Sequence, residues 1–386
     1  MPEISKAASN LKKSQLQHCL NIPNIKDYIS LGLGLPPKQT FLSKIDLSCI
    51  ETQYSPPPQK LKAHIQQLLQ LRRIDTHESN IFLTSGAQQA ISLLLKLFCA
   101  EGDSVICEEF VYPGFISSAK ALGLKCETVK QNFFSGIDVD ALGKRIKEMQ
   151  QKPKLIYLIP DGHNPTSVSI SNQKREALAK ISKRYDIPII EDDAYGFLSY
   201  ENPKKSIFSI NSDNTFYIGS FSKILAPSLR VGWIIAPSKF HEKLSILKEI
   251  SDLNTSNIGM NILARHLEQK DFHAYLSKSI EGYRAKRDVM KKALDEHIAD
   301  SAEYSLPESG MYFWLKLKDG LDAFEIYKKA LEKKLVIMPG IAFSASSKNP
   351  GKEYIRLNFS HPSEEEILEG VGKLAAVLNF FQKPSL

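Results

Sequence analysis

Lys223 is the residue whose setting in this sequence most clearly suggests chemistry. It lies in a loop between two apolar segments, residues 216–220 and 231–236, which we expect to form buried strands. An ammonium group held between such strands loses solvent, so its pKa can fall towards neutrality. A neutral amine can attack a carbonyl carbon and form a Schiff base. The pattern therefore predicts a lysine that binds a carbonyl compound.

Groups that suit a phosphate surround this lysine. The hydroxyls of Ser220 and Ser222 precede it, and Arg230 follows in the same segment. Arginine offers forked donors that match phosphate oxygens. A carbonyl and a phosphate on one ligand indicate pyridoxal phosphate (PLP). Taken alone, a Ser-x-x-Lys motif is short enough to match an ordinary surface lysine, so the rest of the chain has to support this interpretation.

Two polar clusters follow apolar segments that we expect to be strands. Residues 161–166 come after Ile159, and residues 191–195 come after Ile190. Ligands of parallel sheets gather beyond the carboxyl ends of strands. Adjacent buried carboxylates in the second cluster need a cation, and a metal ion or a cationic ligand would each satisfy them. His163 in the first cluster could act as a base, but we favour a packing or hydrogen-bonding role.

Residues 80–90 form another pattern that suits a phosphate. A short apolar strand breaks at Ser85-Gly86, and a strongly apolar helix follows. The first N–H groups of a helix lack partners within it, and the helix dipole favours an anion there. We expect Ser85, Ala87 and Gln88 to bind the phosphate. A plain helix cap is also compatible with the pattern.

Short strands alternate with helices through the middle of the chain, which predicts an α/β fold with a mostly parallel sheet covered by helices on both faces. A long amphipathic helix from residue 271 to residue 297 is expected to link this part to a smaller α+β part. There, residues 304–317 are predicted to be a strand with a turn at 307–310, and in residues 354–359 apolar and polar side chains alternate. Arg356 falls on the polar side of that strand.

The segment 220–233 resembles the cofactor-lysine signature of fold-type I PLP enzymes, and specifically of the class I and II aminotransferases of the aminoadipate, kynurenine and aromatic amino acid type. Residues 163–166 are similar to the His-Asn-Pro-Thr-Gly motif of that family, with Ser167 in place of the glycine. Six such motifs occur in the family's order, from about Ile29 to the final helix. Ser309 also departs from the family's Gly-Gly, near the path of substrates.

The resemblance implies roles for the residues around the cofactor ring. Lys223 holds PLP as an internal aldimine and later moves protons, Asp192 pairs with the pyridine nitrogen, and Tyr195 binds the 3-oxygen. Asn164 also binds that oxygen, and Tyr112 stacks on the ring. Ser85, Ala87, Gln88, Ser220, Ser222 and Arg230 complete the cofactor site of this chain.

The resemblance also implies a substrate site and a homodimer. Arg356 and Asn164 bind the substrate carboxylate, and Gly34 lines that end of the pocket. Tyr54 reaches the phosphate of the cofactor in the partner subunit, although three prolines follow where the family has a glycine shortly after. Residues 1–47 are expected to join a small C-terminal domain, 276–386, and residues 48–275 to form the large PLP-binding domain.

The implied activity is transfer of an amino group from an L-amino acid to a 2-oxo acid by a ping-pong mechanism. A PLP-dependent C–S lyase, or another PLP enzyme of this fold, is the alternative. A penicillin-binding enzyme shares Ser-x-x-Lys, but residues 212–214 precede rather than follow it and no Lys-Thr-Gly occurs. A transaminase-like regulator would need a DNA-binding domain, and only about 28 residues precede the enzyme-like part.

Composition sets outer limits on these interpretations. The chain has 386 residues, a net charge of +7 and five scattered cysteines, which argues against a disulfide framework or a zinc site and for the cytoplasm. No apolar run approaches the roughly 20 residues of a membrane span. A basic cluster at residues 284–292 could bind nucleic acid, but we favour a solvated helix face, and we expect neither nucleic acid nor membrane as a partner.

Overall fold

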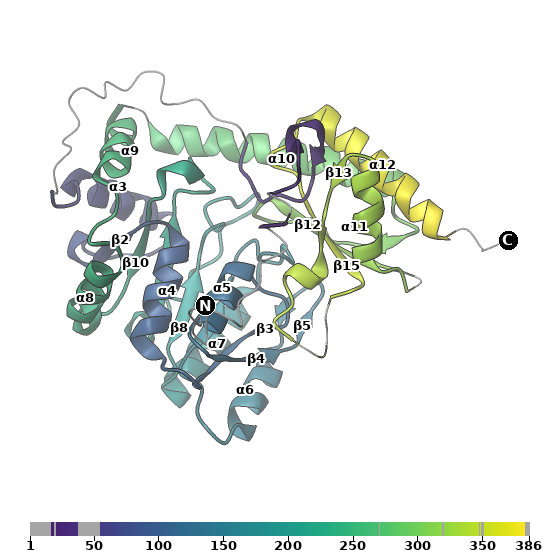
Figure 1. Cartoon of the computed structure of the whole chain (residues 1–386). Helices are drawn as coiled ribbons and strands as arrows, with labels where there is room; N and C mark the ends of the chain where they lie inside the picture. The colour runs from purple at the N-terminus through teal and green to yellow at the C-terminus, as the bar shows by residue number, and fades with distance from the viewer. Residues whose placement is uncertain are drawn as a thin grey trace, which may run out of the picture.

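The computed structural model describes residues 17–18, 21–37, 55–269, 271–318, 320–346, 348 and 351–382. A large sheet with its helices forms one part of the molecule, and a smaller sheet with two helices forms the other. The long helix α10 (Phe272–His297) runs from one part to the other, as the sequence predicts (Figure 1).

The large sheet has seven strands in the order β2-β10-β9-β8-β7-β3-β4. Their bounds are β2 (Ile81–Thr84), β10 (Gly232–Ile235), β9 (Thr215–Ser220), β8 (Ile189–Asp192), β7 (Ile156–Leu158), β3 (Ser104–Glu108) and β4 (Lys125–Val129). Strand β10 is antiparallel to both its neighbours, and the other neighbouring pairs are parallel. The predicted mostly parallel sheet is therefore confirmed. The carboxyl ends of β7, β8 and β9 lie at the same edge.

Helices cover both faces of this sheet. Helices α4 (Ala87–Phe98) and α5 (Pro113–Ala121) pack with the larger apolar core, and α6 (Val139–Glu148) and α7 (Asn172–Tyr185) pack with a second core on the opposite face. Side-chain caps define where the second pair begins. Asp138 accepts a hydrogen bond from the Ala141 N–H at 2.9 Å, as expected for a helix N-cap.

Three further helices lie beside the strand β2 end of the sheet: α3 (Gln59–Gln70), α8 (His241–Asp252) and α9 (Asn257–Gln269). The apolar positions predicted for the first of these, Leu61, Ile65, Leu68 and Leu69, are all buried. Within the described ranges, no helix combines the length and the apolar character that crossing a membrane requires.

The smaller sheet has the order β11-β12-β15-β14, with β11 (Ala302–Glu303), β12 (Tyr312–Leu317), β15 (Tyr354–Asn358) and β14 (Met338–Pro339). Helices α11 (Ala323–Glu332) and α12 (Glu364–Gln382) lie in the same part of the molecule as this sheet. The sequence predicts a strand at 304–317 with a turn at 307–310, and only the part before that turn is wrong, because β12 begins at Tyr312. Pro307 cannot donate to a ladder, and Gly310 turns the chain with a φ of 81°.

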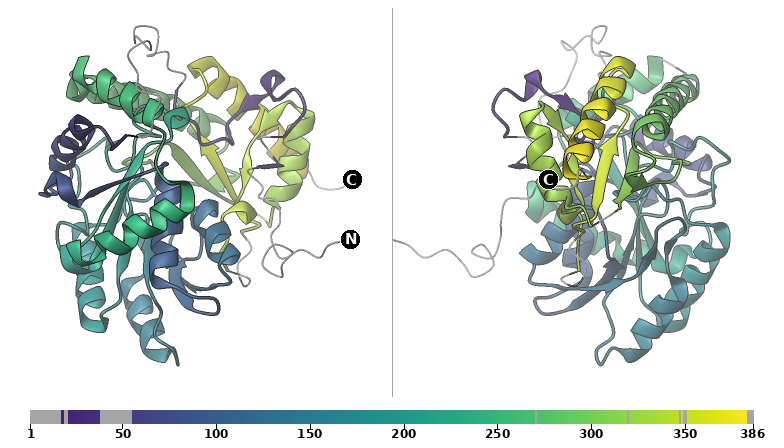
Figure 2. Two further views of the ribbon diagram at one scale, coloured as in Figure 1. Left: turned by 60° about the vertical axis from the view of Figure 1, so that its left-hand side comes forward. Right: turned by 90° about the vertical axis from the view of Figure 1, so that its right-hand side faces the viewer.

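The N-terminal segment joins this smaller part. Strand β1 (Ile29–Ser30) pairs in parallel with β13 (Leu335–Val336), so segments distant in sequence lie side by side (Figure 2). The predicted boundary between residues 275 and 276 falls inside α10. The division into three segments stays a prediction, and the pairing of β1 agrees with it.

Candidate active site

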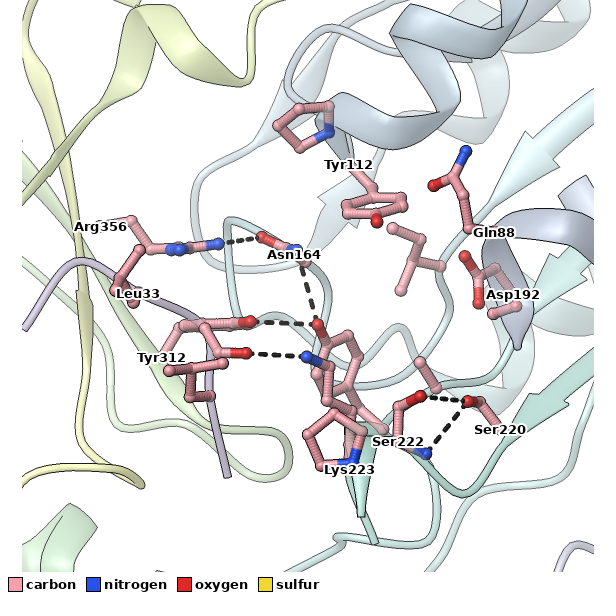
Figure 3. A pocket seen from close by; sticks show the side chains of 18 of the residues that line it. Leu33, Gln88, Tyr112, Asn164, Asp192, Ser220, Ser222, Lys223, Tyr312 and Arg356 are labelled. Carbon is pink, nitrogen blue, oxygen red and sulfur yellow. Dashed lines mark hydrogen bonds between the residues drawn. The ribbon is translucent and has the colours of Figure 1, made fainter. Parts of the chain in front are cut away.

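A cavity of about 250 Å³ opens where the carboxyl ends of β7, β8 and β9 meet the smaller sheet (Figure 3). It collects most residues that the sequence analysis singled out, from segments more than 300 positions apart. The predicted residues that line it are Gly34, Ala87, Gln88, Tyr112, Asn164, Asp192, Tyr195, Ser220, Ser222, Lys223, Arg230 and Arg356.

Two predicted residues are not among the lining. The hydroxyl of Ser85 donates to Asp252 Oδ2 at 2.8 Å, away from the cavity, while the Ser85 carbonyl accepts from Arg230 Nη2 at 3.1 Å. Ser85 therefore contacts Arg230 through its backbone and not through its side chain. Tyr54 lies outside the described residues.

Lys223 enters the cavity from the loop between β9 and β10. The antiparallel pairing of Ser220 with Gly232 fixes both ends of that loop, and the Tyr283 hydroxyl donates to the Lys223 carbonyl at 3.0 Å. Lys223 Nζ donates to the carbonyl of Gly34 at 2.7 Å. Burial, which removes water from the ammonium group, lowers the pKa of Lys223. A lysine in this setting can lose its proton and act as a nucleophile or base.

Asp192 lies at the end of β8, inside the same cavity. Its Oδ2 accepts a hydrogen bond from the Tyr157 hydroxyl at 2.5 Å, and the Tyr157 ring stacks on Phe115 with 4.0 Å between centroids. Its Oδ1 is buried and has no hydrogen-bond partner. Burial raises the pKa of Asp192 to about 6. A buried carboxylate with one open oxygen is prepared for a cationic or donor group of a ligand.

Arg230 and the start of α4 form a cup for an anion. Arg230 has a left-handed backbone, with φ of 54°, and its Nη1 donates to Ser222 Oγ at 3.3 Å. The Ser222 N–H in turn donates to Ser220 Oγ at 3.1 Å. At Gly86, where φ is 82°, a Cβ would collide with the Arg230 guanidinium, so only glycine lets the arginine approach the helix N-terminus. The N-terminus of α4 and this guanidinium together favour a phosphate.

Arg356 lies on β15 at the opposite end of the cavity and is 4% exposed. Its Nη1 donates to Asn164 Oδ1 at 2.7 Å and its Nη2 to the Gly32 carbonyl at 2.6 Å, while Nε is buried without a hydrogen-bond partner. The sequence analysis placed Arg356 on a polar strand face. In the structure Arg356 and Asn358 on that face are buried and Tyr354 is half-buried, and the N-terminal segment contacts Arg356 through the Gly32 carbonyl.

Tyr112 and Gln88 occupy the side of the cavity near α5. Burial raises the pKa of Tyr112 to about 12, so its hydroxyl is neutral. Gln88 Nε2 donates to the Gly114 carbonyl at 3.1 Å and to Ser118 Oγ at 2.9 Å. Gln88 therefore ties α4 to α5 as well as lining the cavity.

Tyr312 is a cavity residue that the sequence analysis missed. The hydroxyls of Tyr312 and Tyr195 lie 3.1 Å apart, and the Arg356 guanidinium lies 4.1 Å from the centre of the Tyr312 ring. The segment was predicted only as a strand. The one signal in the sequence was the alternation of side chains along the strand, which places Tyr312 and Trp314 on the same face. Trp314 is the direct partner of Arg356 on the neighbouring strand.

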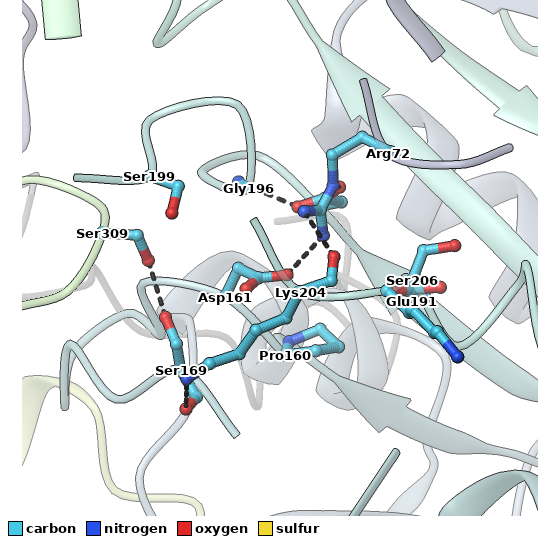
Figure 4. A network of polar contacts seen from close by, with 12 residues as sticks. Arg72, Pro160, Asp161, Ser169, Glu191, Gly196, Ser199, Lys204, Ser206 and Ser309 are labelled. Carbon is cyan, nitrogen blue, oxygen red and sulfur yellow. Dashed lines mark hydrogen bonds and ion pairs between the residues drawn. The ribbon is translucent and has the colours of Figure 1, made fainter. Parts of the chain in front are cut away.

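A buried charge network lies behind the cavity (Figure 4). Arg72 is 1% exposed, and it forms ion pairs with Asp161 and Asp193. Arg175 Nη2 pairs with Asp161 Oδ1 at 2.8 Å. Burial alone would raise the pKa of Asp161, but Arg175 and Arg72 outweigh it and lower that pKa to about 2. No sequence motif marks Arg72 or Arg175.

The other carboxylates next to Asp192 are also occupied within the protein. Asp193 accepts from Arg72, from the Tyr217 hydroxyl at 2.7 Å and from the Gly196 N–H at 2.8 Å. Glu191 accepts from the backbone N–H groups of residues 207 and 208. Within the described part of the chain, no group of three or more His, Cys, Asp or Glu side chains could hold a metal ion. His163 Nε2 lies 2.9 Å from Glu108 Oε2, also inside the protein.

The open groups of the cavity fit PLP. The Arg230 cup would hold a phosphate, the free Asp192 oxygen would meet a protonated ring nitrogen, and Lys223 could bind an aldehyde. Arg356 remains for a carboxylate. These positions come from four different elements and converge on one cavity.

Known proteins are similar to this chain in both sequence and fold. The family model "Aminotransferase class I and II" matches residues 36–374. An aromatic-amino-acid aminotransferase of Thermococcus litoralis is 32% identical, over 97% of this chain and 93% of that protein. The kynurenine aminotransferase of Pyrococcus horikoshii, solved with PMP, superimposes with a TM-score of 0.89 at 28% identity, covering 98% of both chains. The α-aminoadipate aminotransferase of Thermus thermophilus, complexed with N-(5'-phosphopyridoxyl)-L-leucine, gives the same TM-score and identity, covering 98% of this chain and 97% of that one.

Proposed function

This chain belongs to the class I and II aminotransferases, and we propose that Lys223 is the lysine through which it holds PLP and moves the proton during transamination. When bound, PLP supplies an aldehyde that condenses with amines and a ring that accepts electrons from the substrate α-carbon. The observation that carries the assignment is the buried, unpartnered Asp192 oxygen in the cavity that Lys223 enters.

We propose that each end of the cavity holds one charged part of the ligands. Arg230, the hydroxyls of Ser220 and Ser222, and the start of α4 at Ala87 and Gln88 would hold the phosphate, while Tyr112 would lie against the ring. Asp192 would keep the ring nitrogen protonated, and Tyr195 and Asn164 would donate to the ring oxygen. Asn164 Nδ2 already lies 3.5 Å from the Tyr195 hydroxyl.

Arg356 would bind the α-carboxylate of the amino acid, with Asn164 at its side and Gly34 leaving room. With the carboxylate held there and the substrate amine in place of the lysine on the cofactor, Lys223 Nζ would be free to take a proton from the α-carbon and return it to the cofactor side, because burial already favours its neutral form. Positioned proton transfer of this kind contributes about 10²–10⁴-fold to a rate.

The walls around Arg356 indicate the kind of donor. Leu33, Leu35 and Phe343 line the cavity there, and an apolar side chain of an L-amino acid would pack against them. The named relatives act on aromatic, kynurenine and aminoadipate substrates. We propose an L-amino acid with a largely apolar side chain as donor and a 2-oxo acid as acceptor.

A homodimer in the cytoplasm completes the proposal, with Tyr54 reaching the cofactor phosphate of the partner subunit. Apolar side chains exposed on and next to α8 support a subunit interface, since large exposed apolar patches mark interaction surfaces. They are Ile246, Ile250, Leu253 and Ile258, which are 42–78% exposed. Sedimentation velocity measures the subunit number directly, and a monomer at working concentration would contradict this part.

The test of the proposed function is an absorbance titration of the purified protein with PLP, followed by a panel of L-amino acids without any 2-oxo acid. We expect a cofactor band to form, and an apolar or aromatic donor to convert it stoichiometrically to the amine form. Release of pyruvate and ammonia from a cysteine conjugate without an acceptor would instead identify the C–S lyase alternative. The absence of any cofactor band would contradict the assignment.

A further inference from the structure

Tyr312 lies where the two ends of the cavity meet. On the antiparallel pair of β12 and β15, Trp314 is the direct partner of Arg356, so Tyr312 is the diagonal neighbour of Arg356 on the same face. The centre of its ring lies 4.1 Å from the Arg356 guanidinium carbon, and the centre of the Phe343 ring lies 4.6 Å from the same atom. Two rings therefore contact the guanidinium, in addition to its hydrogen bonds to Asn164 and Gly32.

The hydroxyl of Tyr312 serves the other end of the cavity. It lies 3.1 Å from the Tyr195 hydroxyl, which in turn lies 3.5 Å from Asn164 Nδ2. Asn164 Oδ1 accepts from Arg356 Nη1 at 2.7 Å. Arg356, Asn164 and Tyr195 thus form a chain of contacts, and Tyr312 closes it into a ring, because its hydroxyl meets Tyr195 and its aromatic ring meets Arg356. Figure 3 shows Arg356, Asn164 and Tyr312 around this part of the cavity.

The absence of a side chain at Gly34 leaves the space that the Tyr312 hydroxyl occupies. A Cβ at Gly34 would collide with that oxygen and would lie 3.1 Å from the Tyr312 Cζ. The carbonyl of Gly34 is also the acceptor for Lys223 Nζ. A side chain at residue 34 would therefore displace the tyrosine, and the glycine allows the Tyr312 hydroxyl to lie beside the backbone that binds Lys223.

We propose that Tyr312 is a positioning residue that links carboxylate binding to the cofactor ring: its aromatic ring orients Arg356, and its hydroxyl orients the Tyr195 hydroxyl. The inference rests on the proposed function, because it takes Arg356 as the carboxylate site and Tyr195 as a ligand of the ring oxygen. The two roles belong to separate parts of one side chain, so separate substitutions distinguish them.

Tyr312→Phe removes the hydroxyl and keeps the ring, and Tyr312→Leu removes both. The carboxylate probe is 3-phenylpropionate, which has no amine and cannot react, and calorimetry measures its dissociation constant with and without PLP. We expect Tyr312→Phe to bind the probe within about 2-fold of wild type. We expect Tyr312→Leu to bind it about 5–30-fold more weakly, the value of a desolvated cation–π contact.

The hydroxyl is tested by the absorbance of the bound cofactor as a function of pH. Tyr312→Phe should shift the midpoint of that titration and lower kcat by about 3–10-fold, because Tyr195 loses a buried hydrogen bond. Tyr304→Phe is the matched control, since that hydroxyl bonds Asp295 at 2.9 Å outside the cavity. The control should change neither the midpoint nor the probe affinity.

The proposal is overturned if Tyr312→Leu binds 3-phenylpropionate like wild type, or if Tyr312→Phe keeps the wild-type pH titration. If Tyr312→Leu does not fold, Tyr312→Met supplies an apolar side chain of similar reach for the same measurement. Failure of the proposed function would look different, because wild-type protein would then not bind PLP. The probe titration on cofactor-free protein would still test the contact between Tyr312 and Arg356.

Discussion

The candidate active-site cavity and the buried charge network behind it lie at the same strand ends, but buried polar groups are paired in the network and partly unpaired in the cavity. In the network, Asp161 and Asp193 are each paired with Arg72 and with further donors. In the cavity, one oxygen of Asp192 and the Nε of Arg356 are buried without hydrogen-bond partners. Burial of a polar group is costly unless it is paired.

This difference separates charges that are paired within the protein from charges that remain open to a ligand at one sheet edge. Asp192 and Asp193 are neighbours in sequence, and both are buried at the end of β8. Only the one with an open oxygen faces the cavity. The network holds the strand ends in place, and under the proposed function the open groups would bind the cofactor and the substrate. The comparison predicts that substitutions in the cavity affect catalysis, whereas substitutions in the network affect stability.

The largest expected effect is that of Lys223→Ala on turnover. Removal of the amine eliminates the group that moves the proton, so we expect kcat to fall by about 10⁴-fold, the upper end for such groups. The free energy of unfolding of the cofactor-free protein should change little, because a desolvated ammonium is itself unfavourable. Fixed-time activity assays measure kcat, and urea denaturation measures the free energy of unfolding. Near-normal turnover would end the assignment of Lys223.

The second expected effect is a loss of stability when the buried charge network is broken. Arg72→Met leaves Asp161 and Asp193 buried with one cation fewer, and breaking such a pair costs about 3–5 kcal/mol of unfolding free energy. Urea denaturation measures this loss. Lys291→Met is the matched control, because its pair with Asp295 is exposed and such pairs contribute about 0–1 kcal/mol. Equal losses in both variants would contradict the contrast between the two regions.

A smaller effect should appear in the pH dependence of stability. Burial raises the pKa of Asp192 to about 6 and that of Glu191 to about 7, both above the values of about 4 expected in the unfolded chain. The folded protein therefore binds these protons more tightly. Their contribution to stability is present below about pH 4 and is lost as the pH rises to about 7. We expect a loss of about 1–3 kcal/mol from each group.

The same pH dependence sharpens the comparison when PLP is added. The ring nitrogen would pair with Asp192 but would not reach Glu191, whose two oxygens already accept from backbone N–H groups. PLP should therefore remove the contribution of Asp192 to the pH dependence of stability and leave the contribution of Glu191 unchanged. Unfolding at pH 5 and pH 7.5, with Asp192→Asn and Glu191→Gln as comparisons, measures this. An unchanged slope on adding PLP would place the cofactor away from Asp192.

The sequence predicted the cavity better than the network because cavity residues occur in short motifs. Asp192 ends a strand, Asn164 and Lys223 each follow one, and the parallel sheet brings those strand ends together. The pairing of Arg72 with Asp193 spans 121 positions. No local pattern marks it, since an arginine at the end of an amphipathic helix is ordinarily exposed.

Tyr312 and Ser85 show two other reasons why sequence was insufficient. Tyr312 was not predicted because its strand is mostly apolar, which is typical of a buried core strand. Only the register with β15 places it beside Arg356. Ser85 was expected to bind phosphate from its position in a strand–glycine–helix pattern. Its hydroxyl instead donates to Asp252, a residue 167 positions away. The direction of a side chain depends on distant neighbours that the motif does not contain.

The most direct test of the central claim is to identify which lysine binds PLP. The protein is loaded with PLP, reduced with borohydride to make the linkage permanent, digested and mapped by mass spectrometry. The assignment predicts one phosphopyridoxyl group per chain, on Lys223, and none in Lys223→Ala. A label on another lysine, or no label in wild-type protein, would contradict it.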